Sequence, residues 1–386
     1  MGLPKPPGWS SLVRRVEGVD VVRAVHTVDQ AVNAGRIEIK RRRESLRPTV
    51  IVTYRGWYGQ GVAHLVARAI EKPVFTAGEA TVGTGEVLKA NLRRFLVLTI
   101  EGVTIRASMA GTEGQFTSDS EGYLHIDLPV GELSPGWHVL DIDPVEGSSV
   151  EHTTGRIFVP DPAGGLAVVS DIDDTILKTG LTQRWTVPLV RTTLRDVADR
   201  KPVPGMAELY AALARGISTG GGARRAVPFY YVSTGSWNYY DYLVAFLNLH
   251  RFPRGPLFLT DWGPRADRLM RDGREHKRAT IRALLRDNPT YEFVLIGDVG
   301  QGDPETYEVM AREFPDQVRA IVLLYVGSHL AERTAEVSAR AARLREDEGV
   351  PMYFVQDAAE AATAAWQLGL VEDTAIAQVV AAIQRR

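Results

Sequence analysis

The sequence contains no cysteine, and this absence removes several kinds of chemistry. Without thiols the chain forms no disulfide, has no thiolate nucleophile and holds no cysteine-ligated zinc. The absence also argues against a small secreted scaffold, because such scaffolds depend on disulfides.

Long apolar runs are missing as well. The best run, Ala320 to Val326, is far shorter than the roughly 20 residues that span a bilayer. Residues 1–19 lack an apolar core of signal-peptide length. We therefore expect a cytoplasmic protein without a transmembrane span, touching a membrane at most peripherally.

Lysine is scarce, with 7 residues against 38 arginines, so a lysine beside a motif carries extra weight. The net charge is only −2, but residues 1–60 hold 11 Lys/Arg and 5 Asp/Glu, a net of +6 that leaves −8 for the rest. The densest basic block, Lys40–Arg43, suits anionic lipid head groups, and the alternative is a solvated face or arm. No aromatic residues interleave with it, so nucleic acid is not favoured.

The 386 residues suffice for two or three domains. Residues 1–45 are expected to form a basic, partly helical lead-in. Residues 46–160 contain short β-rich runs separated by turn residues, a pattern typical of an all-β sandwich. The runs are Thr49–Tyr54, Ala63–Arg68, Phe95–Ile100, Tyr123–Leu128 and Trp137–Ile142.

Residues 161–386 follow a different rhythm, in which apolar runs alternate with helical patterns. This alternation predicts an α/β domain with a parallel, Rossmann-like sheet covered by helices on both faces. The expected strands lie at 166–170, 227–232, 256–259, 292–296, 318–326 and 351–355. Expected helices include Tyr239–Leu249 and His276–Arg286.

The most informative motif is Asp171-x-Asp173-x-Thr175, directly after the apolar run Leu166–Val169. Open α/β sheets bind ligands beyond the carboxyl ends of their strands, and here such a strand ends in two carboxylates. A nucleophile and a proton donor can thereby flank one phosphorus atom. The alternative is an Asp-rich turn that caps a helix.

Three further elements follow in order. Ser233-Thr234-Gly235 ends an apolar strand and offers donors for phosphate oxygens. Lys277 is expected to open an amphipathic helix, where a cation opposes the helix dipole unless an anion is nearby. Asp298 then ends another strand, with Asp303 five residues on, and paired strand-end carboxylates suit Mg²⁺.

In this order the four elements resemble the motifs of the haloacid dehalogenase-like phosphotransferase superfamily over residues 165–330. The resemblance implies that Asp171 attacks phosphorus and that Asp173 serves as acid and base. It further implies Mg²⁺ on Asp171, Asp298 and the Asp173 backbone carbonyl, and phosphoryl oxygens on Ser233, Thr234, Gly235 and Lys277. Thr175 and Asp303 would take supporting roles. A response-regulator receiver also combines Asp, Ser/Thr and Lys with Mg²⁺, but it lacks the downstream Gly-Asp junction.

A finer likeness covers most of the chain. The stretches SDIDDTI, YYVSTGSWNYY and FVLIGDVGQGDPETY, behind a β-rich region, resemble the phosphatidate phosphatase family of the yeast actin-patch protein and its bacterial relatives. The resemblance implies a Mg²⁺-dependent phosphatase that releases diacylglycerol from phosphatidate.

Two sequence features are compatible with a lipid substrate. Aromatic residues lie close in sequence to the motifs, although core packing is the alternative for each. Leu181–Leu194 mixes apolar residues with arginines and is a candidate flap that meets a membrane. The aromatic residues are Trp185, Trp237, Tyr239, Tyr240, Phe252 and Trp262.

Other functions remain open on the sequence alone. A soluble phosphatase for small phosphomonoesters would use the same motifs. A phosphotransferase would pass the phosphoryl group to an acceptor other than water. A non-enzymatic interaction protein is the third alternative, and the presence of both Asp171 and Asp173 counts against it.

Overall fold

A computed structural model describes residues 48–72, 98–148, 150–178, 201–217, 225–260, 269–300, 302–325 and 331–385. The predicted lead-in 1–45 with its basic block Lys40–Arg43 and the predicted flap Leu181–Leu194 lie outside the described residues. Trp185 and Trp262 lie outside them as well.

The N-terminal sheet is largely antiparallel and has the order β1-β3-β2-β8-β7-β4-β5, with β6 also pairing with β3. β2 and β8 are an exception, because they pair in parallel. The strands are β1 (Thr49–Thr53), β2 (Arg55–Gly59), β3 (Val62–Glu71), β4 (Thr104–Met109), β5 (Thr112–Thr117), β6 (Tyr123–Pro129), β7 (Gly136–Pro144) and β8 (Thr153–Val159).

This sheet encloses a core of its own. Alternate residues of β3 and β6, such as Leu65 and Ile126, pack against residues of β4, β7 and β8, such as Ile105 and Ile157. Along β6, Leu124, Ile126 and Leu128 are buried while His125 and Asp127 are exposed, as its polar and apolar alternation predicts.

Four of the five β-rich runs are confirmed as strands β1, β3, β6 and β7. Of the run Phe95–Ile100, residues 95–97 lie outside the described part, and Thr99 forms a single bridge with Ile70. The sequence pattern missed β2, β4, β5 and β8.

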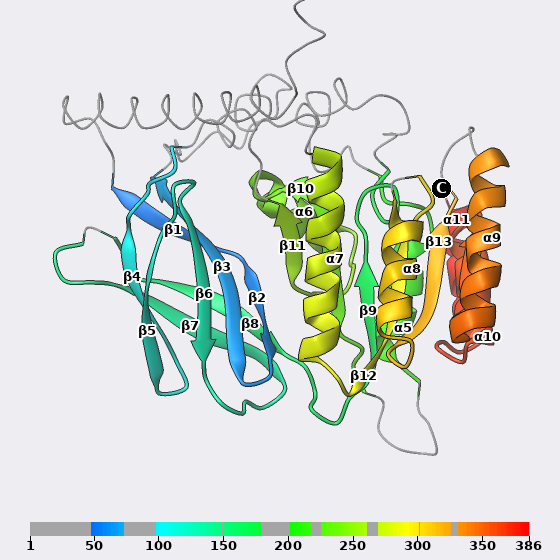
Figure 1. Ribbon diagram of the computed structural model, residues 1–386, viewed down its shortest axis with the longest axis horizontal. Helices are drawn as coiled ribbons and strands as arrows, with labels where there is room; N and C mark the ends of the chain where they lie inside the picture. Colours follow the sequence, from blue (N-terminus) through cyan, green and yellow to red (C-terminus); the bar gives the residue numbers. More distant parts are fainter. Residues whose placement is uncertain are drawn as a thin grey trace, which may run out of the picture.

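The C-terminal sheet is parallel throughout, with the order β11-β10-β9-β12-β13-β14 (Figure 1). All six predicted strands are confirmed within a few residues. They are β9 (Gly165–Ser170), β10 (Phe229–Ser236), β11 (Leu257–Thr260), β12 (Tyr291–Asp298), β13 (Val318–Leu324) and β14 (Met352–Val355).

Helices cover both faces of this sheet, as the apolar runs predict. One face packs against α5 (Met206–Arg215), α6 (Tyr240–Leu249), α10 (Ala358–Gln367) and α11 (Thr374–Gln384). The other packs against α7 (Leu269–Asp287), α8 (Asp303–Glu313) and α9 (Ala331–Glu348), which lie in front of the sheet in Figure 1.

The strand order places a topological switch between β9 and β12. From β9 the chain proceeds outward through β10 to β11, then returns to the other side of β9 and proceeds through β12 to β14. Ligands of doubly wound sheets bind at such a switch, outside the carboxyl ends of the strands. Asp171 follows β9 and Asp298 ends β12, so both carboxylates lie there.

None of the described helices combines the length and the apolar character that crossing a membrane requires.

Candidate active site

The turn after β9 presents the first two carboxylates. The Asp171 N–H donates to the carbonyl of Ile296 on β12 (2.8 Å), which holds the end of β9 against its neighbour. Asp174 has a φ of 57°, a left-handed conformation that Asp tolerates better than most residues, and its N–H donates to Leu177 O (2.8 Å). Strained residues of this kind cluster at functional sites.

Asp171 is buried, and hydrogen bonds hold both of its carboxylate oxygens. Lys277 Nζ contacts Oδ1 at 2.7 Å, and the Thr175 hydroxyl donates to Oδ2 at 3.1 Å. The predicted supporting role of Thr175 therefore has a structural counterpart, because the hydroxyl orients the predicted nucleophile.

Lys277 links the two acidic motifs. Besides Asp171 it contacts Asp303 Oδ1 at 2.5 Å, and the other oxygen of Asp303 accepts the Asp298 N–H at 3.2 Å. The expectation that Lys277 opens its helix is wrong. Helix α7 begins at Leu269, so Lys277 lies about two turns inside it, and two buried carboxylates rather than the helix terminus account for its position.

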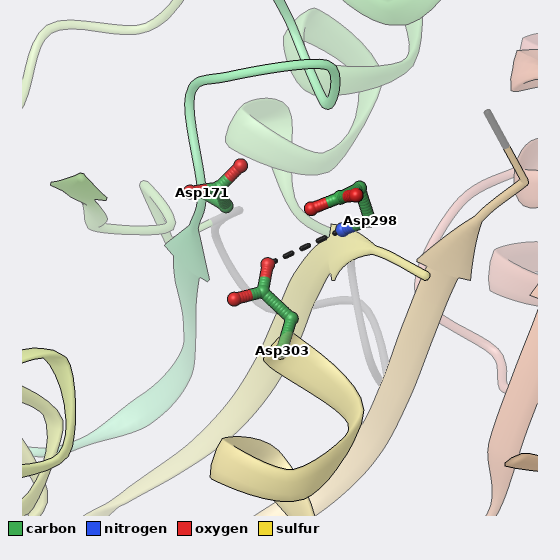
Figure 2. A group of neighbouring side chains, drawn as sticks. All are labelled: Asp171, Asp298 and Asp303. Carbon is green, nitrogen blue, oxygen red and sulfur yellow. Dashed lines mark hydrogen bonds between the residues drawn. The ribbon is translucent and has the colours of Figure 1, made fainter. Parts of the chain in front are cut away.

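Three carboxylates converge beside this lysine. Figure 2 shows Asp171 after β9, Asp298 at the end of β12 and Asp303 at the start of α8, with their oxygens directed toward a common space. Each offers an oxygen that lies within 4.8 Å of the others, and all three side chains are buried.

Burial of these negative groups disfavours their ionised forms. Burial raises the pKa of Asp171 to about 8 although Lys277 opposes the shift, and Asp303 and Asp173 raise it further. The pKa of Asp298 also lies well above its usual range, because of burial and then of repulsion by Asp303 and Asp171. Burial alone would lower the pKa of Lys277, but Asp171 and Asp303 outweigh burial and raise it. The cluster therefore has an excess of carboxylates over paired cations.

A hard divalent cation fits this donor set. Asp298 Oδ1 is buried and has no hydrogen-bond partner among the described residues, while Oδ2 accepts the Gly300 N–H at 2.6 Å. Mg²⁺ prefers such oxygen ligands, a small number of carboxylates and water. Asp298 offers the one oxygen of the three carboxylates that accepts no hydrogen bond among the described residues, and oxygens of Asp171 and Asp303 lie within 4.8 Å of the group.

Asp173 lies apart from the carboxylate cluster and is partly exposed. The Ser233 hydroxyl donates to Asp173 Oδ2 at 3.0 Å and accepts the Gly235 N–H at 2.9 Å. Ser233, predicted to bind phosphoryl oxygens, thus holds the predicted acid and base in this structure. Asp173 is therefore partly accessible to solvent, whereas Asp171 is buried.

Thr234 and Gly235 follow Ser233 at the carboxyl end of β10, and these three residues form an irregular loop within the strand, where the pairing with β11 shifts register. Bulges of this type are frequent next to active sites. The Thr260 hydroxyl contacts the carbonyls of Thr234 (2.8 Å) and Gly235 (3.1 Å). The structure therefore brings all the predicted site residues to one edge of the sheet.

Sequence reasoning missed the residues behind the site. Ser170 donates to Asp171 O (2.6 Å) and contacts the Tyr210 hydroxyl (2.7 Å). The Tyr307 hydroxyl donates to Ile296 O (3.0 Å), the same carbonyl that accepts the Asp171 N–H. The contact of Ser170 with Tyr210 joins residues 40 positions apart, so no local sequence pattern indicates it.

Four of the predicted aromatic residues lie within the described part of the chain, and the suggested lipid-facing role is not supported for three of them, while Tyr239 is partly buried and packs against the same core. Trp237, Tyr240 and Phe252 are buried in the core between the parallel sheet and its helices. For these three, ordinary core packing is the correct interpretation.

The raised pKa of Asp171 leads to a stability prediction. The pKa of Asp171 rises from 3.8 in the unfolded chain to about 8 in the folded protein. Asp171 therefore contributes fully to the free energy of unfolding below about pH 4. This contribution is lost as the pH rises toward 8. A Mg²⁺ ion held by these carboxylates would compete with the proton on Asp171, so we expect the rise in Tm on adding Mg²⁺ to grow between about pH 5 and about pH 8. Thermal unfolding with and without Mg²⁺ measures this, with Asp298→Asn as the variant expected to lose most of the shift. A shift of equal size at every pH would contradict the prediction.

Comparison with known proteins confirms the resemblance that the motifs indicate. Residues 166–324 match the family model described as the catalytic domain of phosphatidate phosphatase APP1. The match includes the predicted site residues from Asp171 to Asp303.

Two curated fungal proteins are similar to the chain. It is 29% identical over 228 residues to phosphatidate phosphatase APP1 of Saccharomyces cerevisiae, covering 54% of this chain and 34% of that protein. It is 22% identical over 291 residues to an uncharacterised protein of Schizosaccharomyces pombe, covering 70% and 46% respectively. The chain thus spans less than half the length of these relatives.

Two solved structures align with the chain at low TM-scores. A mutant of the PilB minor pilin from Streptococcus sanguinis aligns over 73% of this chain and 90% of its own, at 8% identity and a TM-score of 0.27. A carbohydrate esterase aligns over 86% and 99%, at 8% identity and a TM-score of 0.23. These scores are too low to support an argument about fold or function.

Proposed function

We propose that the chain is a Mg²⁺-dependent phosphatase, on the premise that residues 166–324 form a catalytic domain of the phosphatidate phosphatase type. The observation that carries the proposal is the convergence of Asp171, Lys277, Asp298 and Asp303 at the topological switch of the parallel sheet. In this proposal the parallel sheet is of the haloacid dehalogenase type and the N-terminal sheet is a β-sandwich.

The proposed reaction proceeds in two displacements. A carboxylate oxygen of Asp171 attacks phosphorus and forms an aspartyl-phosphate, while the bond from phosphorus to the ester oxygen breaks. Protonated Asp173 gives its proton to that leaving oxygen. Water then attacks the same phosphorus, Asp173 takes the water proton, and the bond to Asp171 breaks to release phosphate.

Several contacts support these roles. Thr175 and Lys277 fix the orientation of the Asp171 carboxylate, which favours one direction of attack. Ser233 positions Asp173, and its hydroxyl can turn to a phosphoryl oxygen when Asp173 is protonated. Lys277 places a positive charge next to the reacting phosphoryl group.

The metal has a defined place in this proposal. The carboxylates of Asp171 and Asp298 and the backbone carbonyl of Asp173 would hold Mg²⁺. When bound, the ion supplies Lewis-acid stabilisation of the negative charge on the phosphoryl oxygens.

For the substrate we propose phosphatidate, hydrolysed to diacylglycerol at the surface of an anionic membrane. The support is the name of the yeast relative and of the family model. Because the chain spans about a third of that relative, a soluble phosphomonoester is the second candidate substrate.

Phosphate release distinguishes the candidate functions. Purified protein with Mg²⁺ is expected to release phosphate from phosphatidate in mixed micelles at least about tenfold faster, by kcat/KM, than from p-nitrophenyl phosphate, a ratio that corresponds to about 1.4 kcal/mol of transition-state discrimination. Excess EDTA should remove both activities, and added Mg²⁺ should restore them.

The possible results separate the proposals. Faster turnover of soluble esters would contradict the lipid assignment and keep the phosphatase. Full activity in EDTA would contradict the metal, and no phosphate release from any phosphomonoester would contradict the function itself.

A further inference from the structure

The N-terminal sheet touches the chain just after the Ser233-Thr234-Gly235 loop. Tyr54, between β1 and β2, stacks on Trp237 with ring centroids 4.3 Å apart and an interplanar angle of 20°. Tyr54 also contacts Tyr240, and the Tyr240 hydroxyl accepts the Arg55 N–H at 2.7 Å. Trp237 begins the short helix η2 (Trp237–Tyr239), which follows β10 directly.

Arg68 of β3 makes the most specific contact with this segment. Its Nη1 donates to Asn238 Oδ1 at 2.9 Å, and its Nε donates to Glu121 O at 3.3 Å. The guanidinium lies 4.5 Å from the centroid of the Tyr123 ring, on the paired strand β6. Arg68 therefore reaches Asn238 from a fixed position on the N-terminal sheet.

Asn238 is connected to the loop by short-range bonds. Its N–H donates to Ser236 Oγ at 3.2 Å, and Ser236 is the last residue of β10. One residue before Ser236, the Gly235 N–H donates to Ser233 Oγ, and the Ser233 hydroxyl donates to Asp173. The β10–β11 ladder shifts register between Val232 and Ser236, so regular strand pairing does not fix the loop on that side.

A second hydrogen bond joins the N-terminal sheet to the far end of helix α7. Trp57 of β2 donates its indole N–H to Asp287 Oδ2 at 3.1 Å. Asp287 is the last residue of α7, about 15 Å along the helix from Lys277 at 1.5 Å per residue. The interface therefore includes contacts beside the catalytic loop and a hydrogen bond at the opposite end of α7.

We propose that Arg68, through Asn238, is a positioning residue for the Ser233-Thr234-Gly235 loop, and that the N-terminal sheet thereby completes the active site. The inference rests on the proposed phosphatase function for its kinetic consequence. Arg68 and Asn238 hold the segment after the loop, and the loop in turn holds the acid and base Asp173. Displacement of this segment would misplace donors that act on the transition state, and errors of about 1 Å can cost on the order of 100-fold in rate.

The kinetic test compares the two contacts. Arg68→Met keeps the aliphatic stem but removes the donors, and Asn238→Ala removes the acceptor. Each is expected to lower kcat for p-nitrophenyl phosphate by about tenfold or more with KM changed less, because the loop acts in the transition state. The double variant should be no slower than the slower single variant, since both remove one interaction. Arg68→Lys should recover part of the rate.

Trp57→Phe is the matched control, because it removes the hydrogen bond to Asp287. It should lower Tm about as much as Arg68→Met does and leave kcat within about twofold of the wild type.

Hydrogen exchange supplies a readout that does not need activity. Amides of residues 233–239 should exchange faster in Arg68→Met and Asn238→Ala than in the wild type. Their exchange rates in Trp57→Phe should equal those of the wild type. Unchanged exchange and kcat in both Arg68→Met and Asn238→Ala would overturn the proposal, as would an equal loss of kcat in Trp57→Phe. If the wild type releases no phosphate, the proposed function fails, and exchange at residues 233–239 still decides whether Arg68 positions the loop. If Arg68→Met does not fold, Asn238→Ala decides.

Discussion

Asp171→Asn is expected to abolish phosphate release while leaving the fold intact. The amide keeps the shape of the side chain and still offers an oxygen to Lys277 or Thr175, but it is not a nucleophile. The loss in kcat should be on the order of 10³-fold or more, as for other residues that form a covalent intermediate. Because Asn removes a buried negative charge, the metal-free variant should be at least as stable as the wild type near pH 8.

A neighbouring aspartate supplies the matched control for this variant. Asp174 lies in the same turn and has a left-handed backbone that Asn adopts at least as readily. Asp174→Asn should therefore retain activity within a few-fold of the wild type. Wild-type turnover by purified Asp171→Asn, measured as phosphate release, would refute the assignment of the nucleophile.

Lys277→Met is expected to have the second large effect, on stability as well as on rate. The substitution removes the cation that bonds to Asp171 and Asp303 and leaves both carboxylates buried without it. Breaking a buried ion pair in this way costs about 3–5 kcal/mol. The loss should be larger at and above pH 8, where Asp171 ionises, and smaller near pH 5, where Asp171 keeps its proton because burial raises its pKa to about 8.

Urea unfolding at the two pH values measures this loss, with Arg282→Met as the control. Arg282 lies on the same helix and pairs with Glu313 at 2.6 Å, but the pair is exposed to solvent. Its loss should cost at most about 1 kcal/mol at either pH. Equal and small losses in both variants would contradict the role of Lys277 at the centre of a buried acidic cluster.

The sequence predicted those parts of the fold that depend on local patterns. Strands β9 and β12 are continuous apolar runs, and each ends in the aspartates of the site, so their meeting at one sheet edge follows from parallel topology. The pairing of β9 with β12 does not follow from local pattern, because it depends on the switch in strand order.

The predictions made from the sequence were wrong where packing between distant segments determines helix bounds or residue burial. Residues 271–275 are polar or glycine, so no apolar periodicity indicates that α7 begins as early as Leu269. Trp237 and Phe252 pack in the core, but the sequence around them does not distinguish a core aromatic residue from a lipid-facing one. Arg68 contacts Asn238, which lies 170 positions away, and Ser233 contacts Asp173, which lies 60 positions away. Short sequence motifs do not predict contacts between residues so far apart in the chain.

The central claim is that Asp171 becomes covalently phosphorylated during turnover. The most direct test is to quench the protein during turnover of phosphatidate or p-nitrophenyl phosphate with Mg²⁺, reduce with borohydride and locate the reduced side chain by mass spectrometry. The account predicts conversion of Asp171 to homoserine in the wild type and none in Asp171→Asn. Turnover without any modification of Asp171, or with modification at another aspartate, would contradict it.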